Sequence, residues 1–357
     1  MANEGDNFYL PSLSPLITVD DWGNKVHRRT VTAILVEVAY MLEHHRQKYG
    51  HDGPQLDLSW LEKSYYFQLD HPLIDTDEKN ATFGAIFKYI HPNPARNSPQ
   101  YVIALRGTIL KSDTSLRDII LNIKCALNKL HHSPRFQVAM QNVERTFNLD
   151  GAPTVWLAGH SLGSAIALLA GKKMAKMGYN LETYLFNPPF LSPSDIFKYE
   201  WVNSVIRQVN SVCKASLSKL GRQPYDDPFD MLSNWVPYLF VNPHDPICGK
   251  YIGYFEHRIT MKKKGHEKVE RRATKTSLRS QFSRKIGYSN SEADEPLHLL
   301  PSADLTINRG PKQKIEGAHK IKGAHGIEQW WNPYMKYEFI ENRYNTKTFY
   351  RGPSLWG

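Results

Sequence analysis

The stretch of sequence that decides the fold is residues 154–171, TVWLAGHSLGSAIALLAG. Its first five residues, TVWLA, are apolar and predict a short buried strand. The pentapeptide GHSLG (residues 159–163) follows and matches the pattern G-x-S-x-G, and the small and apolar residues after it predict a helix. Glycines around a serine at such a strand–turn–helix junction let neighbouring segments approach closely while the hydroxyl stands at the helix N-terminus. We therefore interpret Ser161 as a nucleophile.

A serine hydroxyl is a weak nucleophile, so this interpretation requires a base and donors for the oxyanion that forms on an attacked carbonyl. The first donor expected at such a turn is the backbone N–H of Leu162. The second is expected from a loop after an earlier strand, and ALRGT (residues 104–108), which ends the apolar run YVIAL, is the best candidate. Thr108 offers its N–H and its hydroxyl there. The alternative is that RGT simply ends a strand.

The acid and the base of such a serine are expected later in the chain, in the order serine, carboxylate, histidine, with the carboxylate after a late strand. Asp245 follows the strand-like run YLFV, whereas three other aspartates lie in a Pro-containing segment without a strand: Asp226, Asp227 and Asp230. The histidines that follow Asp245 are His257, His266, His298, His319 and His325. His325 precedes the aromatic run IEQWW, which can anchor it, and His319 is the alternative. His160, beside the nucleophile, is interpreted as a packing residue that shapes the turn.

The rest of the chain alternates between strand and helix patterns. Apolar spacing predicts helices over residues 30–50 and 115–130, a hairpin of strands over 81–90 and 101–105, and buried strands over 183–186 and 238–241. This alternation after residue 100 predicts an α/β fold with a largely parallel sheet. We expect an irregular lead-in over residues 1–29 and a single domain over 30–357. The helix over 115–130 fits a core helix or a lid over the site.

The net charge of +10 is concentrated in one segment. Residues 258–285 contain eleven basic and two acidic residues, a net +9, so the remainder of the chain is nearly neutral. This pattern predicts an ordinary globular body with a basic, flexible insertion over about 258–314, because a nucleic-acid-binding protein is commonly basic over a wide surface. Phe282 is the only Phe, Tyr or Trp among these charges, so stacking on nucleic-acid bases is not indicated. Nucleic acid is therefore not the expected partner.

Four motifs in order resemble the class 3 lipases, the fungal-lipase-like α/β hydrolases. They are ALRGT (104–108), GHSLGSAIA (159–167), VNPHDPI (241–247) and HGIEQW (325–330), and they are most similar to plant intracellular lipase-like members. The resemblance implies an α/β-hydrolase fold with Ser161, Asp245 and His325 as catalytic residues and Thr108 and Leu162 as the oxyanion hole. Ser164 and Leu105 stand where the family usually has Gly and Phe, which are mild packing changes.

The expected function is hydrolysis of carboxylic esters of lipids. Two alternatives remain: a hydrolase fold used as a binding scaffold, and a transacylase that uses the same residues. No metal or organic cofactor is predicted, because the chain contains no HExxH, paired CxxC, P-loop or GxGxxG motif. The acidic N-terminus and three scattered cysteines predict a cytoplasmic protein without a signal peptide or membrane span. The basic segment 258–285 predicts peripheral contact with anionic membranes.

Overall fold

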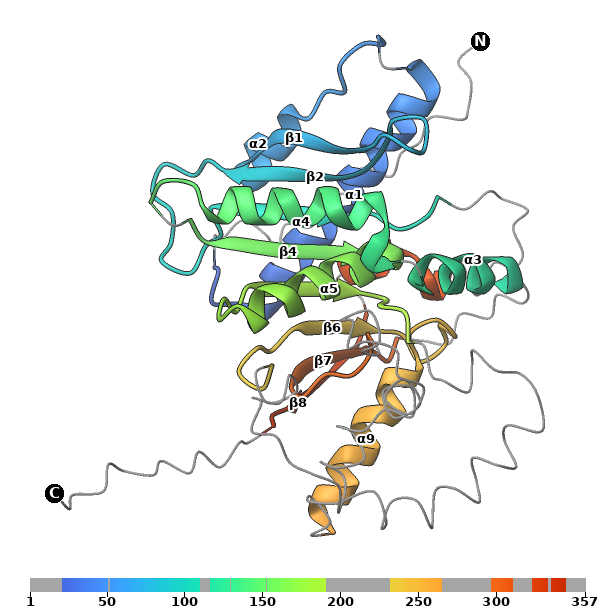
Figure 1. Ribbon diagram of the computed structural model, residues 1–357. Helices are drawn as coiled ribbons and strands as arrows, with labels where there is room; N and C mark the ends of the chain where they lie inside the picture. The colour runs from blue at the N-terminus through green and yellow to red at the C-terminus, as the bar shows by residue number, and fades with distance from the viewer. Residues whose placement is uncertain are drawn as a thin grey trace, which may run out of the picture.

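A single twisted sheet of eight strands organises the molecule, and its strands lie in the order in which they occur along the chain (Figure 1). The computed structural model describes residues 21–50, 52–109, 116–128, 130–151, 153–190, 232–264, 297–310, 323–332 and 335–344. The strands are β1 (Phe67–Asp75), β2 (Ala81–Tyr89), β3 (Tyr101–Leu105), β4 (Val155–His160), β5 (Glu182–Phe186), β6 (Tyr238–Val241), β7 (Ala303–Asn308) and β8 (Tyr337–Asn342). Strands β3 to β7 are parallel, and β1, β2 and β8 add antiparallel edges.

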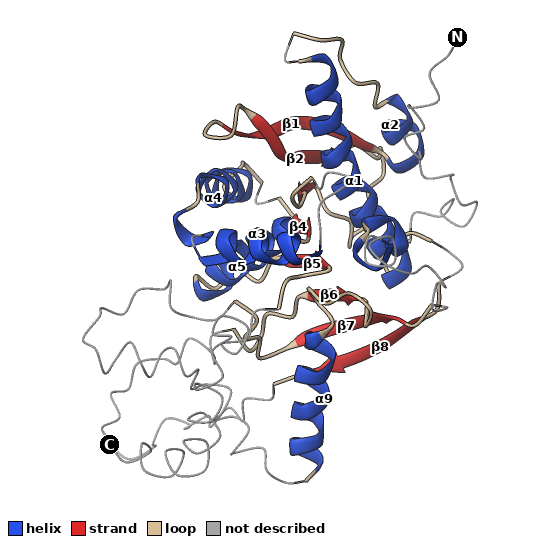
Figure 2. Ribbon diagram, turned by 90° about the vertical axis from the view of Figure 1, so that its right-hand side faces the viewer, coloured by secondary structure: helices blue, strands red, loops and turns tan. Residues whose placement is uncertain are grey.

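Helices cover both faces of the sheet. The α-helices are α1 (Lys25–Tyr49), α2 (Ser59–Tyr65), α3 (Leu116–Asn128), α4 (Pro134–Phe147), α5 (Leu162–Lys176) and α9 (Lys250–Lys263), and the 3-10 helices are η2 (Leu130–His132) and η5 (Ile327–Trp330). Figure 2 shows α1 on one face and α4 and α5 on the other. This layering confirms the predicted α/β hydrolase architecture with a largely parallel sheet.

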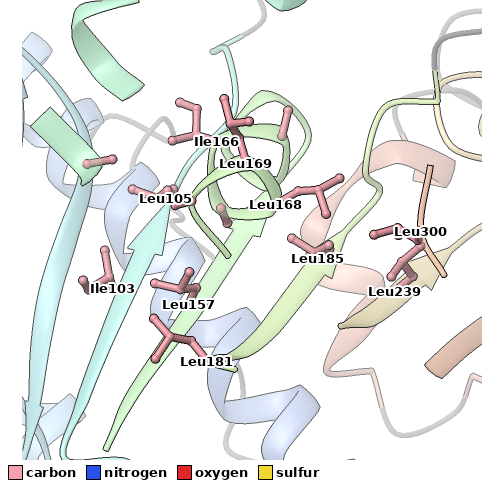
Figure 3. Packing of buried hydrophobic residues seen from close by; sticks show 14 of the residues in the cluster. Ile103, Leu105, Leu157, Ile166, Leu168, Leu169, Leu181, Leu185, Leu239 and Leu300 are labelled. Carbon is pink, nitrogen blue, oxygen red and sulfur yellow. The ribbon is translucent and has the colours of Figure 1, made fainter. Parts of the chain in front are cut away.

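Two hydrophobic clusters, one on each face, fix the sheet between these helices. Strand residues that alternate along the chain point to opposite faces: Ile103, Leu157 and Leu185 pack under α5, as Figure 3 shows. Val102, Trp156 and Phe186 point the other way and pack against α1. Because both faces are covered, the central strands carry apolar residues at nearly every position.

Several predicted elements match the structure closely. The helix predicted after Ser161 is α5, and the hairpin predicted over 81–105 is the antiparallel pair of β2 and β3. The helix predicted over 115–130 is α3 followed by η2, and it packs on α5 with Ile123 buried and Leu121 exposed. Strand β1, in a region without a prediction, alternates exposed and buried residues, and its Pro72 fits an edge position.

Two predicted boundaries were wrong. The lead-in over 1–29 is too long, because α1 begins at Lys25, where the Asn24 side chain accepts a hydrogen bond of 2.8 Å from the Val26 N–H and caps the helix. The insertion over 258–314 is too wide, because α9 extends to Lys263 and β7 is a buried strand of the sheet. Arg258 is buried and donates to the Leu300 carbonyl over 2.7 Å. The remaining core of the insertion, residues 265–296, lies outside the described residues.

No helix in the described parts of the chain is both long enough and apolar enough to cross a membrane.

Candidate active site

Ser161 stands in a sharp turn between β4 and α5. Its backbone has φ 53° and ψ −120°, a left-handed conformation that is costly for a residue with a Cβ. Its N–H donates to the Phe186 carbonyl at the end of β5 over 2.9 Å, which holds the turn against the sheet. Strain of this kind persists only where the surroundings enforce it, and it lifts the Ser161 side chain off the end of the strand.

The two glycines of the GHSLG pentapeptide enforce this turn because neighbouring backbone occupies the space of a side chain. A Cβ at Gly159 would overlap the Gly163 carbonyl, and a Cβ at Gly163 would overlap the carbonyl oxygens of Leu105 and Arg106. Gly163 thus lets the loop after β3 lie directly against the start of α5. Without that approach, the RGT segment could not reach the serine.

The structure brings Ser161, Asp245 and His325 together in one hydrogen-bonded line. His325 Nε2 lies 2.9 Å from Ser161 Oγ, and His325 Nδ1 lies 2.8 Å from Asp245 Oδ2. Since the carboxylate can only accept, Nδ1 carries the proton of the neutral ring and Nε2 is free to accept from the serine hydroxyl. All three side chains are buried. This is the arrangement that a serine nucleophile, its base and an orienting acid require.

The Asp245 carboxylate is completely buried, and several donors surround it. Oδ2 accepts from Asn187 Nδ2 over 2.7 Å and from Cys248 Sγ over 3.1 Å, and Oδ1 accepts from the Ile247 N–H over 2.9 Å. Burial opposes the negative charge most strongly, but the His325 ring and these side-chain donors outweigh it and hold the pKa of Asp245 below its usual value. Asp245 is therefore ionised near neutral pH.

Asn187, which the sequence analysis did not single out, ties the acid to the histidine loop. It follows β5 with φ 47°, and its amide group donates to Asp245 and, over 3.1 Å, to the Ala324 carbonyl. Its Oδ1 accepts from the Trp330 indole N–H over 2.7 Å. A polar residue directly after a buried parallel strand was the available signal, since the carboxyl ends of such strands gather at one edge.

The aromatic run after His325 anchors the histidine loop as expected, but a glutamine in that run makes most of the connections. Gln329 Nε2 donates to the Ala324 and Gly326 carbonyls over 2.8 and 2.7 Å, which clamps the backbone on both sides of His325. Its Oε1 accepts from Asn242 over 2.8 Å and from Asn308 over 2.9 Å, at the ends of β6 and β7. His325 is thereby fixed to the sheet.

The RGT loop lies beside the nucleophile. A Cβ at Gly107 would lie 2.8 Å from the Ser161 Cβ, and the Gly107 N–H donates to Tyr40 Oη over 2.8 Å. The Gly107 carbonyl accepts from Arg106 Nη1 over 2.7 Å. Because the peptide is trans, the Thr108 N–H points away from that carbonyl. Leu162, the first residue of α5, has its N–H at a helix terminus, where intrahelical partners are missing.

The other candidates fall elsewhere. His319 and His266 lie outside the described residues, as do Asp226, Asp227 and Asp230. His257 is exposed on α9, and His298 is buried against Phe190 with their ring centroids 4.3 Å apart.

His160 packs under the turn, with Nδ1 2.8 Å from Tyr40 Oη and Nε2 2.7 Å from the His325 carbonyl. Burial, with the nearby His325 ring, lowers the pKa of His160 to about 3, so it stays neutral.

Comparisons with known proteins agree with this architecture. The family model described as Lipase (class 3) matches residues 96–214, which include the GHSLG turn. An Arabidopsis thaliana protein described as a GDSL esterase/lipase is 40% identical over 360 residues, covering 95% of this chain and 98% of that protein. The string GDSL does not occur in this sequence, in which the pentapeptide is GHSLG. The chain belongs to the class 3 lipase family of ester hydrolases.

Solved structures of fungal lipases also match. The Lip2 lipase of Yarrowia lipolytica aligns with a TM-score of 0.36 and 15% identity, over 62% of this chain and 71% of that one. Lipase II of Rhizopus niveus aligns with a TM-score of 0.33 and 14% identity, over 62% of this chain and 73% of that one.

Proposed function

We propose that this protein hydrolyses carboxylic esters of lipids by a serine mechanism in which Ser161 is the nucleophile, His325 the general base and acid, and Asp245 the orienting carboxylate. The observation that carries the proposal is the continuous line of hydrogen bonds from Ser161 Oγ through His325 to Asp245 Oδ2, with distances of 2.9 and 2.8 Å. The strained backbone of Ser161 supports it, because such strain collects at reactive residues.

In the acylation step, Ser161 Oγ attacks the ester carbonyl carbon while its proton passes to His325 Nε2. The carbonyl oxygen becomes an oxyanion, and the N–H groups of Leu162 and Thr108 stabilise it, together with the positive end of the α5 dipole. The bond to the leaving oxygen then breaks, and His325 gives its proton to the departing alcohol. Asp245 stabilises the imidazolium between these transfers. The product is an acyl ester on Ser161.

In the deacylation step, water attacks the same carbonyl carbon and its proton passes to His325 Nε2. The bond to Ser161 Oγ breaks, the fatty acid leaves, and the serine regains its proton from His325. If an alcohol enters in place of water, the same residues transfer the acyl group to it. We propose hydrolysis as the main reaction, with acylglycerols or polar glycerolipids as the substrate class. Product analysis with an added acceptor alcohol distinguishes the two outcomes, because a transacylase forms a new ester and little free acid.

The nucleophile is tested by labelling with an active-site-directed fluorophosphonate. The native protein is expected to take up one label, and the Ser161→Ala variant none. Ser164→Ala is the matched control, because Ser164 Oγ only donates to the Ser161 carbonyl within the first turn of α5 over 2.5 Å, and it should still label. A native protein that stays unlabelled, with no turnover on a broad ester panel, would favour a binding scaffold.

We further propose that the protein acts in the cytoplasm and touches anionic membranes through basic residues beyond α9. The test must spare Arg258, which is buried in the fold. Replacing Lys268, Arg271, Arg272 and Lys275 by Gln should weaken salt-sensitive binding to anionic liposomes by up to about 10³-fold, since each basic residue near such a surface contributes about 1 kcal/mol. Unchanged binding would remove these residues from any membrane contact.

A further inference from the structure

A chain of hydrogen bonds connects the RGT loop to the backbone of His325. The catalytic steps above do not use it. The Gly107 N–H lies 2.8 Å from Tyr40 Oη, Tyr40 Oη lies 2.8 Å from His160 Nδ1, and His160 Nε2 lies 2.7 Å from the His325 carbonyl oxygen. Tyr40 comes from α1 and His160 from the end of β4. Four segments that are distant in the sequence therefore meet directly beneath the nucleophile.

The protons in this chain have a single arrangement because its two ends are fixed. The Gly107 N–H can only donate, and the His325 carbonyl can only accept. Tyr40 Oη therefore accepts from Gly107 and donates to His160 Nδ1, and His160 donates from Nε2 to the carbonyl. A second proton on His160 would leave the Tyr40 hydroxyl proton without its acceptor. Burial opposes that charge as well, in keeping with the lowered pKa of His160.

We propose that Tyr40 and His160 are positioning residues. They set the distance between the RGT loop, which carries the Thr108 N–H, and the His325 backbone. This inference rests on the proposed serine mechanism. Gly107 is held at its N–H by Tyr40 and at its carbonyl by Arg106. Because the Gly107 carbonyl and the Thr108 N–H belong to one planar peptide, this hold decides where the Thr108 N–H points. The same Tyr40 hydroxyl, through His160, holds the backbone of the base.

The positioning of the loop depends on the Tyr40 hydroxyl because the atoms around this hydroxyl are closely packed. A Cβ at Gly107 would lie 2.7 Å from Tyr40 Oη and 3.0 Å from the His160 carbonyl, so the loop is in contact with both residues. Loss of the hydroxyl removes two hydrogen bonds but leaves the ring and its packing in place. We expect the Thr108 N–H to move out of line with the oxyanion, with little change in substrate binding.

The test is Tyr40→Phe, measured on a soluble ester with the active-site concentration determined by fluorophosphonate titration. We expect kcat to fall about 10- to 100-fold, as misplacement of catalytic groups by a fraction of an ångström does, with KM within about twofold. The rate of fluorophosphonate labelling should fall in parallel. Tyr184→Phe is the matched control, because this tyrosine lies on the same face of the sheet but its hydroxyl donates to Glu182 over 2.7 Å and not to the turn that carries Ser161. The kcat of this variant should equal that of the native protein.

Variants of His160 separate positioning from general damage. His160→Gln keeps one acceptor and one donor, so it should retain kcat within about fivefold, whereas His160→Leu should lose as much as Tyr40→Phe. In a double-mutant cycle, Tyr40→Phe with His160→Leu should be no worse than either single change, because both break one chain. Additive losses, or an active native protein with unchanged Tyr40→Phe kinetics, would overturn the inference alone. A native protein that neither labels nor hydrolyses would overturn the proposed function and this inference with it.

Discussion

The two edges of the parallel sheet both gather polar residues, but they do so in different ways. At the carboxyl edge, Ser161, Asn187 and Asp245 follow three successive parallel strands, and their side chains are buried and joined by directed hydrogen bonds. At the amino edge, Arg28 of α1 pairs with Glu182 over 3.0 Å, and the Glu182 side chain is 36% exposed. Carboxyl edges of parallel sheets are where α/β proteins place their sites. The difference indicates that burial and directed donors, more than the number of charges, mark the reactive edge.

The greatest difference in activity is expected between variants of Asp245, at the carboxyl edge, and of Glu182, at the amino edge. Asp245→Asn should lower kcat/KM by about 10³- to 10⁴-fold, because an amide cannot hold the His325 tautomer or stabilise an imidazolium. Glu182→Gln should leave kcat/KM unchanged and lower the unfolding free energy by less than about 1 kcal/mol. Steady-state kinetics and urea denaturation of both variants check this contrast. Equal losses of activity would show that the two edges do not differ as described.

A smaller effect is expected from Asn187, which supports the acid without taking part in proton transfer. Asn187→Gly tolerates the left-handed φ of 47° but loses the amide that contacts Asp245, so kcat should fall about 10- to 100-fold. Asn187→Asp keeps the shape but places a second carboxylate beside the Asp245 Oδ2. Like charges raise the pKa of one member, so the loss of activity should be largest at high pH, where both carboxylates are ionised, and smaller where one of them is protonated. If both variants match the native pH profile, Asn187 has no influence on the acid.

The close approach at the reactive edge predicts a loss of stability. Gly163→Ala should lower the unfolding free energy by about 1–3 kcal/mol, because the new Cβ would overlap the carbonyls of Leu105 and Arg106. Gly253→Ala is the matched control, since a Cβ at that helical position in α9 meets nothing within 4 Å. It should stabilise the protein by about 1 kcal/mol through helix propensity. Chemical denaturation measures both, and a neutral Gly163→Ala would contradict the packing of the loop on α5.

The last prediction concerns the pH dependence of stability, where the expected change over a single pH unit is small. His160 has a pKa of about 3 in the folded protein, far below the ordinary value of about 6.5, so between these pH values the unfolded chain binds one more proton at this site. As pH falls through this window, the unfolding free energy of the native protein should therefore decrease by about 1.4 kcal/mol more per pH unit than that of His160→Gln. Glu37, whose pKa burial and nearby Glu328 raise to about 7, is present in both proteins and cancels in the difference. Parallel slopes would contradict a neutral, buried His160.

The elements that the sequence predicted best are those with strong local patterns. The small and apolar run after Ser161 predicted the helix that is α5, and YLFV predicted the strand that ends before Asp245. Strand β7, ADLTIN, alternates apolar and polar residues as a strand does, but it is short and follows a long charged segment, and it was therefore assigned to the insertion. Its paired residues in β6 and β8 lie at least 29 positions away along the chain, so pairing, and not local preference, forms it.

The candidate site divides in the same way. Ser161, Asp245 and His325 follow from motifs and strand ends, and the structure brings them together, whereas their catalytic roles remain predictions. Tyr40, Arg106, Asn187 and Gln329 were not predicted because their importance lies in partners that local patterns do not reveal. Tyr40, for example, meets Gly107 and His160, which are 67 and 120 residues away. Only the folded sheet brings such pairs into contact.

The attack of Ser161 on the ester can be observed by trapping the acyl-enzyme. The protein is mixed with a slowly deacylating ester, quenched in acid, digested and analysed by mass spectrometry. We expect one acyl group on the peptide that contains Ser161, and none in Ser161→Ala. An acyl group on another residue of the native protein, or turnover that persists in Ser161→Ala, would contradict it.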